Sequence, residues 1–78
     1  SFKEGAYTDS RFGTTYEFGP NGQGQLVGGV SDTPTFTYKI ESDQIVISYG
    51  KGQPEAVFKR IDNKTLERHD GTRLVLQE

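Results

Sequence analysis

The residue types that most often carry chemistry are scarce in this chain of 78 residues. It has one histidine, His69, and no cysteine, and its serines stand at positions 1, 10, 31, 42 and 48. A nucleophilic or metal site needs a base, an orienting group and further ligands that converge. Because His69 stands beside Asp70 in a predicted turn without a second nitrogen ligand, a solvated imidazole is favoured. We predict no catalytic, cofactor-binding or metal-ligating residue, and ligand-binding residues are left open.

The carboxylates that could assist catalysis are scattered along the sequence. Four aspartates fall in turns, where Asp is favoured because its side chain accepts local backbone hydrogen bonds: Asp32, Asp43, Asp62 and Asp70. A hydrolase with paired carboxylates would need Glu17 or Glu41 to meet an acidic partner in a cleft. An enzyme is therefore the least favoured class, and it predicts that His69 clusters with at least two carboxylates.

Two further patterns could bind phosphate, and neither is favoured. The segment 22–28 has a Gly-x-Gly beginning, but Val27 occupies the place of the third glycine of a dinucleotide loop and no helix follows, so we predict a strand or loop. The net charge of −2 argues against nucleic acid as a partner. Five basic residues could gather on the last three strands, although the interleaved acidic residues favour a salt-bridged, solvated face: Lys59, Arg60, Lys64, Arg68 and Arg73.

The elements that would position these residues are short segments of alternating apolar and polar residues, separated by turn residues every eight to twelve positions. This pattern predicts successive antiparallel hairpins. The clearest hairpin spans 35–49, where a two-residue turn at Ser42-Asp43 would pair 40 with 45, 38 with 47 and 36 with 49. The six apolar side chains would then share one buried face: Phe36, Tyr38, Ile40, Ile45, Ile47 and Tyr49.

A second hairpin is predicted over residues 66–76. A three-residue turn at 69–71, with Gly71 in the left-handed conformation, sets Leu66 opposite Leu74 and Glu67 opposite Arg73. A two-residue turn would instead place two arginines opposite each other, which is unfavourable. The longer turn is therefore preferred.

The remaining segments predict strands at 55–61, 14–18 and 23–27, a weaker strand near 5–8 without an identified partner, and a loop at 30–34. In the strand at 55–61, Ala56 and Phe58 lie on one face and Val57 and Ile61 on the other, so both faces could be covered. No segment has the apolar period of an amphipathic helix. We predict a single all-β domain over 1–78, with about seven antiparallel strands in a meander that forms a small barrel or a strongly bent sheet.

Aromatic residues are numerous, and their placement separates two functions. An exposed aromatic strip could stack on a sugar or another flat ligand, whereas a small domain without disulfides or zinc needs aromatic bulk in its core. The core interpretation is favoured for the five aromatics outside the clearest hairpin whose placement is open: Tyr7, Phe12, Tyr16, Phe18 and Phe58.

Three motifs in chain order, YEFGPNG at 16–22, FTYKIESDQIVI at 36–47 and TLERHDGTRLVL at 65–76, resemble the small lipocalin-like β-meander domains of bacterial envelope lipoproteins and secreted proteins. The resemblance implies a β-barrel and a place in the bacterial cell envelope, on the periplasmic side, or outside the cell. Membrane attachment would occur only through a lipidated leader that has been removed. The chain is shorter than a full eight-stranded lipocalin barrel, so an interior that holds a ligand is not expected.

These observations favour a non-catalytic binding or structural domain. We expect it to recognise a protein partner, or a second copy of itself, through a sheet edge or loops. The alternative is a module that binds a small ligand or glycan through exposed Tyr and Phe faces. No apolar segment exceeds three residues, so a membrane-spanning helix is not expected.

Overall fold

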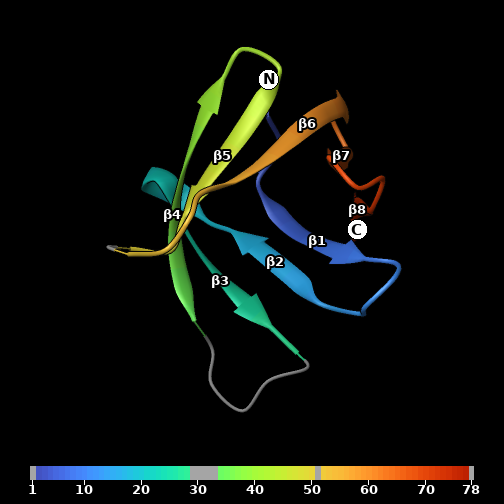
Figure 1. Cartoon of the computed structure of the whole chain (residues 1–78). Coiled ribbons are helices and arrows are strands. Elements are labelled where there is room, and N and C mark those ends of the chain that lie inside the picture. Colours follow the sequence, from blue (N-terminus) through green and yellow to red (C-terminus); the bar gives the residue numbers. More distant parts are fainter. Residues whose placement is uncertain (1, 29–33, 51, 78) are drawn as a thin grey trace.

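The computed structural model describes residues 2–28, 34–50 and 52–77. They form one closed barrel of eight antiparallel strands in which each strand pairs with the next and β8 pairs with β1 (Figure 1). The elements are β1 (Gly5–Asp9), β2 (Thr15–Phe18), η1 (Pro20–Gly22), β3 (Gln23–Val27), β4 (Thr35–Glu41), β5 (Gln44–Ser48), β6 (Ala56–Asp62), β7 (Thr65–Arg68) and β8 (Arg73–Leu76).

The predicted all-β meander is confirmed, but the barrel has eight strands rather than about seven. The N-terminal segment, whose partner the sequence did not identify, pairs on both sides. Tyr7 lies opposite Tyr16 of β2 and opposite Leu76 of β8, so β1 closes the barrel. Strands of only four to seven residues allow eight of them to fit in so short a chain.

The register predicted for the central hairpin is correct at two pairs, Ile40 with Ile45 and Tyr38 with Ile47. The third pair lies beyond the ladder, although the rings of Phe36 and Tyr49 remain 6.0 Å apart. The expectation that Ile40 is buried is wrong, since its exposed fraction is 49%. Strand β3 pairs with β4 only as far as residue 37, so the end of the β4–β5 hairpin projects beyond β3 (Figure 1), and Ile40 lies past the last β3–β4 pair.

The C-terminal hairpin has the predicted register, with Leu66 opposite Leu74 and Glu67 opposite Arg73. Gly71 adopts a φ of 91°, and its N–H donates to the Arg68 carbonyl at 2.9 Å. The three-residue turn with a left-handed glycine is therefore confirmed.

The upstream hairpin also matches its prediction, because β2 runs into a short 3-10 turn and β3 returns as a strand. The segment with the Gly-x-Gly beginning is thus part of the sheet. Strand β6 has one buried face, where Phe58 is fully covered, while Val57 and Ile61 remain exposed on the other. The loop predicted at 30–34 lies outside the described residues except for Pro34. In the described part, no helix is long and apolar enough to cross a membrane.

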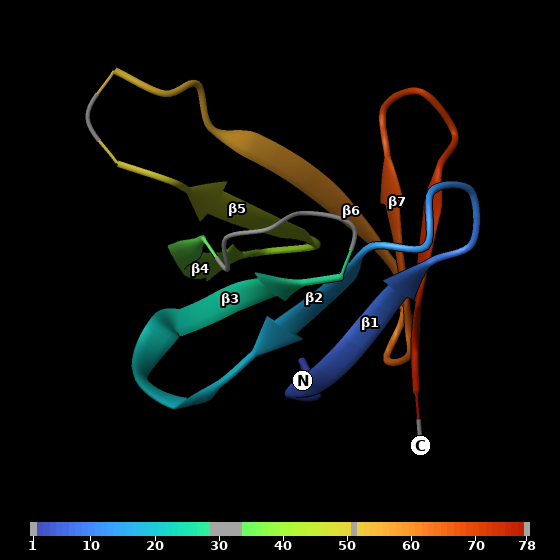
Figure 2. The ribbon, with the colours of Figure 1, turned by 90° about the horizontal axis from the view of Figure 1, so that it is seen from below.

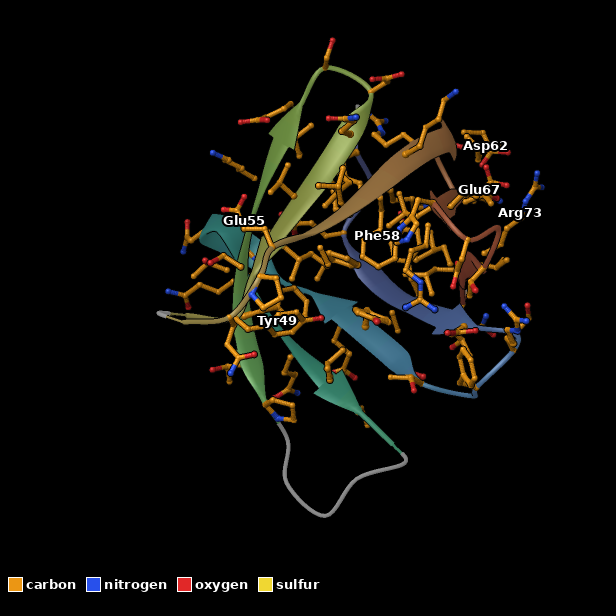
Figure 3. The ribbon with its side chains drawn as sticks, in the orientation of Figure 1. Tyr49, Glu55, Phe58, Asp62, Glu67 and Arg73 are labelled. Carbon is orange, nitrogen blue, oxygen red and sulfur yellow. The ribbon has the colours of Figure 1, made fainter. Side chains whose placement is uncertain are left out.

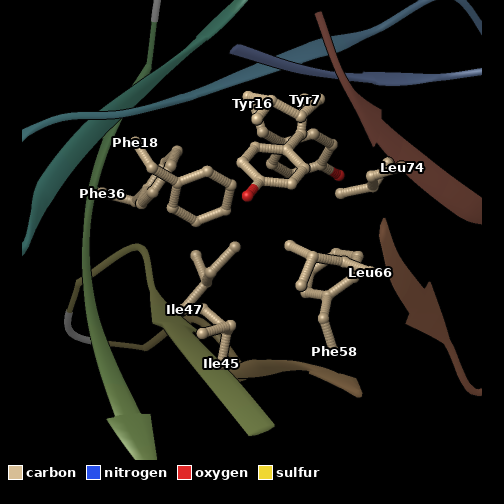
Figure 4. Packing of buried hydrophobic residues seen from close by; sticks show 10 residues of the cluster. Tyr7, Tyr16, Phe18, Phe36, Ile45, Ile47, Phe58, Leu66 and Leu74 are labelled. Atoms are coloured by element: carbon tan, nitrogen blue, oxygen red, sulfur yellow. The ribbon is translucent and has the colours of Figure 1, made fainter. Parts of the chain in front are cut away.

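Aromatic rings fill the barrel interior, together with aliphatic side chains from the opposite wall (Figure 4). Phe18 is the most connected ring, with edge contacts to the rings of Tyr7, Phe36 and Tyr38 at 4.9–5.4 Å. The core interpretation is confirmed for four of the five open aromatics and is wrong for Phe12, which lies on a loop. The buried cluster comprises Tyr7, Tyr16, Phe18, Phe36, Ile45, Ile47, Phe58, Leu66, Leu74 and Leu76.

One glycine makes this aromatic packing possible. Gly24 on β3 lies opposite Phe18 and Phe36 of the neighbouring strands. A Cβ at position 24 would lie 2.6 Å from two carbons of the Phe36 ring and would also contact the Glu17 carbonyl oxygen. The absent side chain therefore gives the Phe36 ring its place against the β3 backbone.

The N-terminal segment covers the barrel end that carries the β2–β3, β4–β5 and β6–β7 turns. The Phe2 ring stacks on Tyr7 at 5.6 Å and meets the edge of Phe18 at 5.3 Å. The Tyr7 hydroxyl donates to the Lys3 carbonyl at 2.6 Å, which holds the segment in place. Phe2 thus extends the aromatic core to the end of the barrel.

Candidate functional site

His69 is exposed on the β7–β8 loop, as the sequence predicts for a solvated imidazole. Within the described ranges, no group of three or more His, Asp or Glu side chains could hold a metal ion. The turn role predicted for the aspartates is supported for Asp62 and Asp70, whose Oδ1 atoms accept the backbone N–H groups of Lys64 and Thr72. Asp32 lies outside the described residues.

An open groove of about 540 Å³ runs along the outer face of β5, β6 and β7. Alternation along β6 creates it, because Phe58 points into the core while its neighbours in sequence point outward. We call it the β6 groove, and its outward side chains include Gln44, Glu55, Val57, Lys59, Glu67 and His69. Figure 3 places Glu55 at the start of β6 and Glu67 on β7, well separated on this side of the barrel.

The lining of the β6 groove includes His69 and two glutamates, Glu55 and Glu67. Strand register sets Glu67 beside Lys59, and Glu55 lies four residues from Lys59 along β6, which corresponds to about 13 Å. Paired carboxylates in glycoside hydrolases lie about 5–9.5 Å apart. By this backbone spacing, Glu55 and Glu67 are farther apart than the carboxylates of such a pair. Glu67 also accepts a hydrogen bond from Arg73 Nε at 3.0 Å.

The predicted basic patch is divided between the surface and the two barrel ends. Arg73 pairs with Glu67, and Arg68 Nε lies 3.3 Å from Asp70 Oδ1, so the salt-bridged interpretation holds for these two arginines. Arg60 departs from the prediction. It follows Phe58 on the inward face of β6, its guanidinium lies 6.0 Å from the Phe2 ring centre, and its Nε is buried without a hydrogen-bond partner among the described residues.

The β1–β2 loop is ordered by a buried aspartate that the sequence analysis did not single out. Asp9 is 2% exposed, and its Oδ1 accepts the backbone N–H groups of Arg11 at 2.7 Å and Phe12 at 3.2 Å. The backbone of Asp9 adds two hydrogen bonds, from its N–H to the Thr14 carbonyl and from the Gly13 N–H to its carbonyl. The motif Asp-x-x-x-Gly at 9–13 is the signal that could have revealed this turn.

This loop presents the most exposed large apolar side chain of the described surface. Phe12 is 66% exposed, and the Arg11 guanidinium lies 5.6 Å from its ring centre. The loop is held beside the β7–β8 loop, since the Ser10 N–H donates to the Arg73 carbonyl and Arg11 Nη1 reaches the Thr72 hydroxyl at 3.5 Å (Figure 2). We refer to residues 10–14 as the Phe12 loop.

Two groups near this barrel end have shifted pKa values. The backbone N–H and hydroxyl of Thr72, together with Arg68, hold the pKa of the Asp70 carboxyl well below its usual range. Burial beside the Tyr16 hydroxyl raises the pKa of Tyr49 to about 12. Asp70 is thus a stable anion, and Tyr49 a persistent neutral phenol, at ordinary pH.

The described hollows open on the outer surface, and the side chains of the buried cluster occupy the barrel interior. Another hollow, of about 500 Å³, lies over β1, β2 and β3. It contains Glu17 and Gln25, which hydrogen-bond to each other at 2.7 Å. Its one aromatic side chain, Phe18, is buried in the core, so this hollow offers no ring face for stacking.

Comparison with known proteins adds nothing to these observations. The chain matches no family model, no curated protein and no solved structure. What the structure shows is the architecture, an eight-stranded antiparallel meander barrel.

Proposed function

We propose that this barrel is a non-catalytic protein-binding domain of a bacterial envelope or secreted protein, and that the Phe12 loop carries its contact surface. The exposure of Phe12 on a loop fixed by hydrogen bonds is the observation that supports this proposal most directly.

The closed topology favours loops over a sheet edge as the contact surface. Each of the eight described strands has a partner on both sides, so the described barrel presents no free edge for strand addition. Of the two surfaces expected from the sequence, the loops therefore remain.

The Phe12 loop has two properties of a binding loop. Buried Asp9 fixes its backbone before any partner arrives, which lowers the entropy lost on binding. Phe12 itself is covered by no core residue, so its apolar ring contributes little to the stability of the barrel. Aromatic and arginine side chains are enriched in the centres of protein interfaces, and Phe12 and Arg11 supply one of each.

Binding of a glycan or another small ligand is the alternative. It receives less support, because most of the aromatic faces that could stack on a sugar are inside the barrel. Phe12 is the ring left for such a contact with a large exposed fraction. Titration with oligosaccharides and lipids, followed by the NMR signals of the Phe12 loop, distinguishes this alternative from protein recognition.

A photo-crosslinking amino acid at position 12 tests the proposal, with the same group at exposed Val75 of β8 as the control. The modified domain is incubated with an envelope extract of its source bacterium. We expect a crosslinked protein at position 12 that excess unmodified domain displaces and excess Phe12→Ala does not. Products of equal intensity at both positions, or equal displacement by both competitors, would overturn the proposal. A self-crosslink with the same selectivity would identify a second copy as the partner.

A further inference from the structure

A second surface, separate from the Phe12 loop, has a charge pattern that defines what it could bind. Glu55, the residue before β6, and the outward Val57 and Lys59 of β6 stand at alternate positions along the β6 groove. They present an acid, an apolar group and a base in a straight row, about 6.6 Å apart.

Neither charge of this row forms an ion pair in the part of the chain that the structure describes. Glu67 lies opposite Lys59 but forms its ion pair with Arg73. Lys39 forms its ion pair with Glu41, and Glu55 adds a weaker electrostatic attraction at Lys39. Glu67 and Lys39 are thus paired with other residues, while Glu55 and Lys59 form no ion pair among the described residues.

The apolar floor between these charges is formed by a cross-strand pair. Val57 lies opposite Val46 of β5. Val46 is buried although it faces outward, and Val57 is 42% exposed above it. Contact with an apolar side chain would remove this remaining surface of Val57 from water.

We propose that the β6 groove binds an extended segment of a partner protein that carries a basic, an apolar and an acidic residue at alternate positions. In an extended chain, side chains on one face recur every two residues at the spacing of the β6 row. The basic residue lies over Glu55, the apolar residue over Val57 and the acidic residue over Lys59. The strand packs face to face with the barrel wall and needs no free edge.

Charge complementarity makes the proposal specific. A segment with two basic or two acidic residues in the same places would meet one like charge on the row. Each exposed opposite-charge pair contributes about 0.2–1 kcal/mol and a like-charge contact costs a similar amount, so each mismatch lowers affinity by about two- to thirtyfold.

Three blocked peptides test the proposal by NMR titration: Lys-Thr-Val-Thr-Glu, Lys-Thr-Val-Thr-Lys and Glu-Thr-Val-Thr-Glu. We expect the first to bind most tightly and to shift the amide signals of residues 55–59, with an affinity at least twofold above either of the others. Shifts confined to other strands, equal affinity for all three peptides, or no binding at millimolar concentration would overturn the proposal.

A specificity switch provides the second measurement. Glu55→Lys gives the row two cations, so the peptide with two glutamates should become the preferred ligand. Glu17→Lys, an outward substitution on β2, is the matched control and should leave the order of the peptides unchanged. A Glu55→Lys variant that folds and keeps the original preference contradicts the assignment. Val57→Ser should weaken all three peptides.

Discussion

Substitution of Gly24 by alanine is the sharpest test of how the barrel is packed. The new Cβ would lie 2.6 Å from two carbons of the Phe36 ring, whereas carbon atoms in contact are normally about 3.5–4.0 Å apart. The ring would have to move by about 1 Å. It is confined by the rings of Phe18 and Tyr38, so such a movement disturbs the whole cluster.

We expect Gly24→Ala to lower the free energy of unfolding by about 3 kcal/mol, at the upper end of the usual cost of overpacking. A domain of this size has a total stability of about 4–12 kcal/mol, so the variant loses a large part of it. Gly13→Ala is the matched control. The space around Gly13 is open and its φ is +75°, so alanine there brings only backbone strain of about 1 kcal/mol.

Urea unfolding followed by far-UV circular dichroism and tyrosine fluorescence measures both variants, since the chain has no tryptophan. Phe36→Leu removes the ring carbons that the new Cβ would overlap. The double variant Gly24→Ala/Phe36→Leu should therefore lose at least about 1 kcal/mol less free energy of unfolding than the sum of the two single losses. A Gly24→Ala variant no less stable than Gly13→Ala, or strictly additive losses, would refute the packing argument.

Four further predictions concern stability. Phe2→Ala should cost about 2 kcal/mol in urea unfolding, less than a fully buried phenylalanine, because the ring is only partly covered. Ser42→Gly should stabilise by about 0.5 kcal/mol, because Ser42 holds a φ of 59° that glycine adopts without strain. Folding favours the protonated phenol of Tyr49, whose pKa rises from 10.0 to about 12. The contribution of this group to folding stability is present below pH 10 and is lost as the pH rises through 12. Tyr49→Phe should therefore flatten the decline in urea midpoint over this range. The lowered pKa of Asp70 acts at the other extreme: its contribution is present above pH 3.8 and lost as the pH falls below that value, so Asp70→Asn should flatten the acid decline.

Each of these predictions has its own contrary result. The exposed neighbour Glu4 is the control for Phe2, and equal losses for the two alanine variants would contradict the end-covering role of the ring. A Ser42→Gly variant less stable than the parent chain would show that the turn is not strained. For Tyr49 and Asp70, substitution without any change in the slope of stability against pH would mean that other groups carry the dependence.

The hairpins could be predicted from the sequence because their information is local. Gly71 and the pairing of Glu67 with Arg73 define one register through turn conformation and opposite charges, and both features are present in the structure. Alternation places most inward side chains correctly for the same reason. It does not report where a neighbouring strand ends, and therefore the exposure of Ile40 could not be predicted.

The remaining features depend on contacts between distant segments. Arg60 belongs to the inward row of β6, but its position beside Phe2 requires the N-terminus to fold over the barrel end, 58 positions away in sequence. The closing pairs between β1 and β8 require all the intervening strands. Among candidate contact residues, aromatic bulk alone favours the core for Phe12. The turn formed by Asp9 keeps this ring on the surface instead.

Closure through the first and last strands has a consequence for how the chain reaches this state. Every neighbouring pair except β1 with β8 is joined by a connection along the chain, so a growing polypeptide can form seven of the eight strand interfaces in order. Until the final strand leaves the ribosome, β1 and β7 each keep one row of unsatisfied amides and carbonyls, which is where misassembly with another nascent chain would begin. The vulnerable period therefore ends only when β8 is free to pair with both neighbours, and the hydrogen bond from the Gln77 N–H to the Ala6 carbonyl joins the last row.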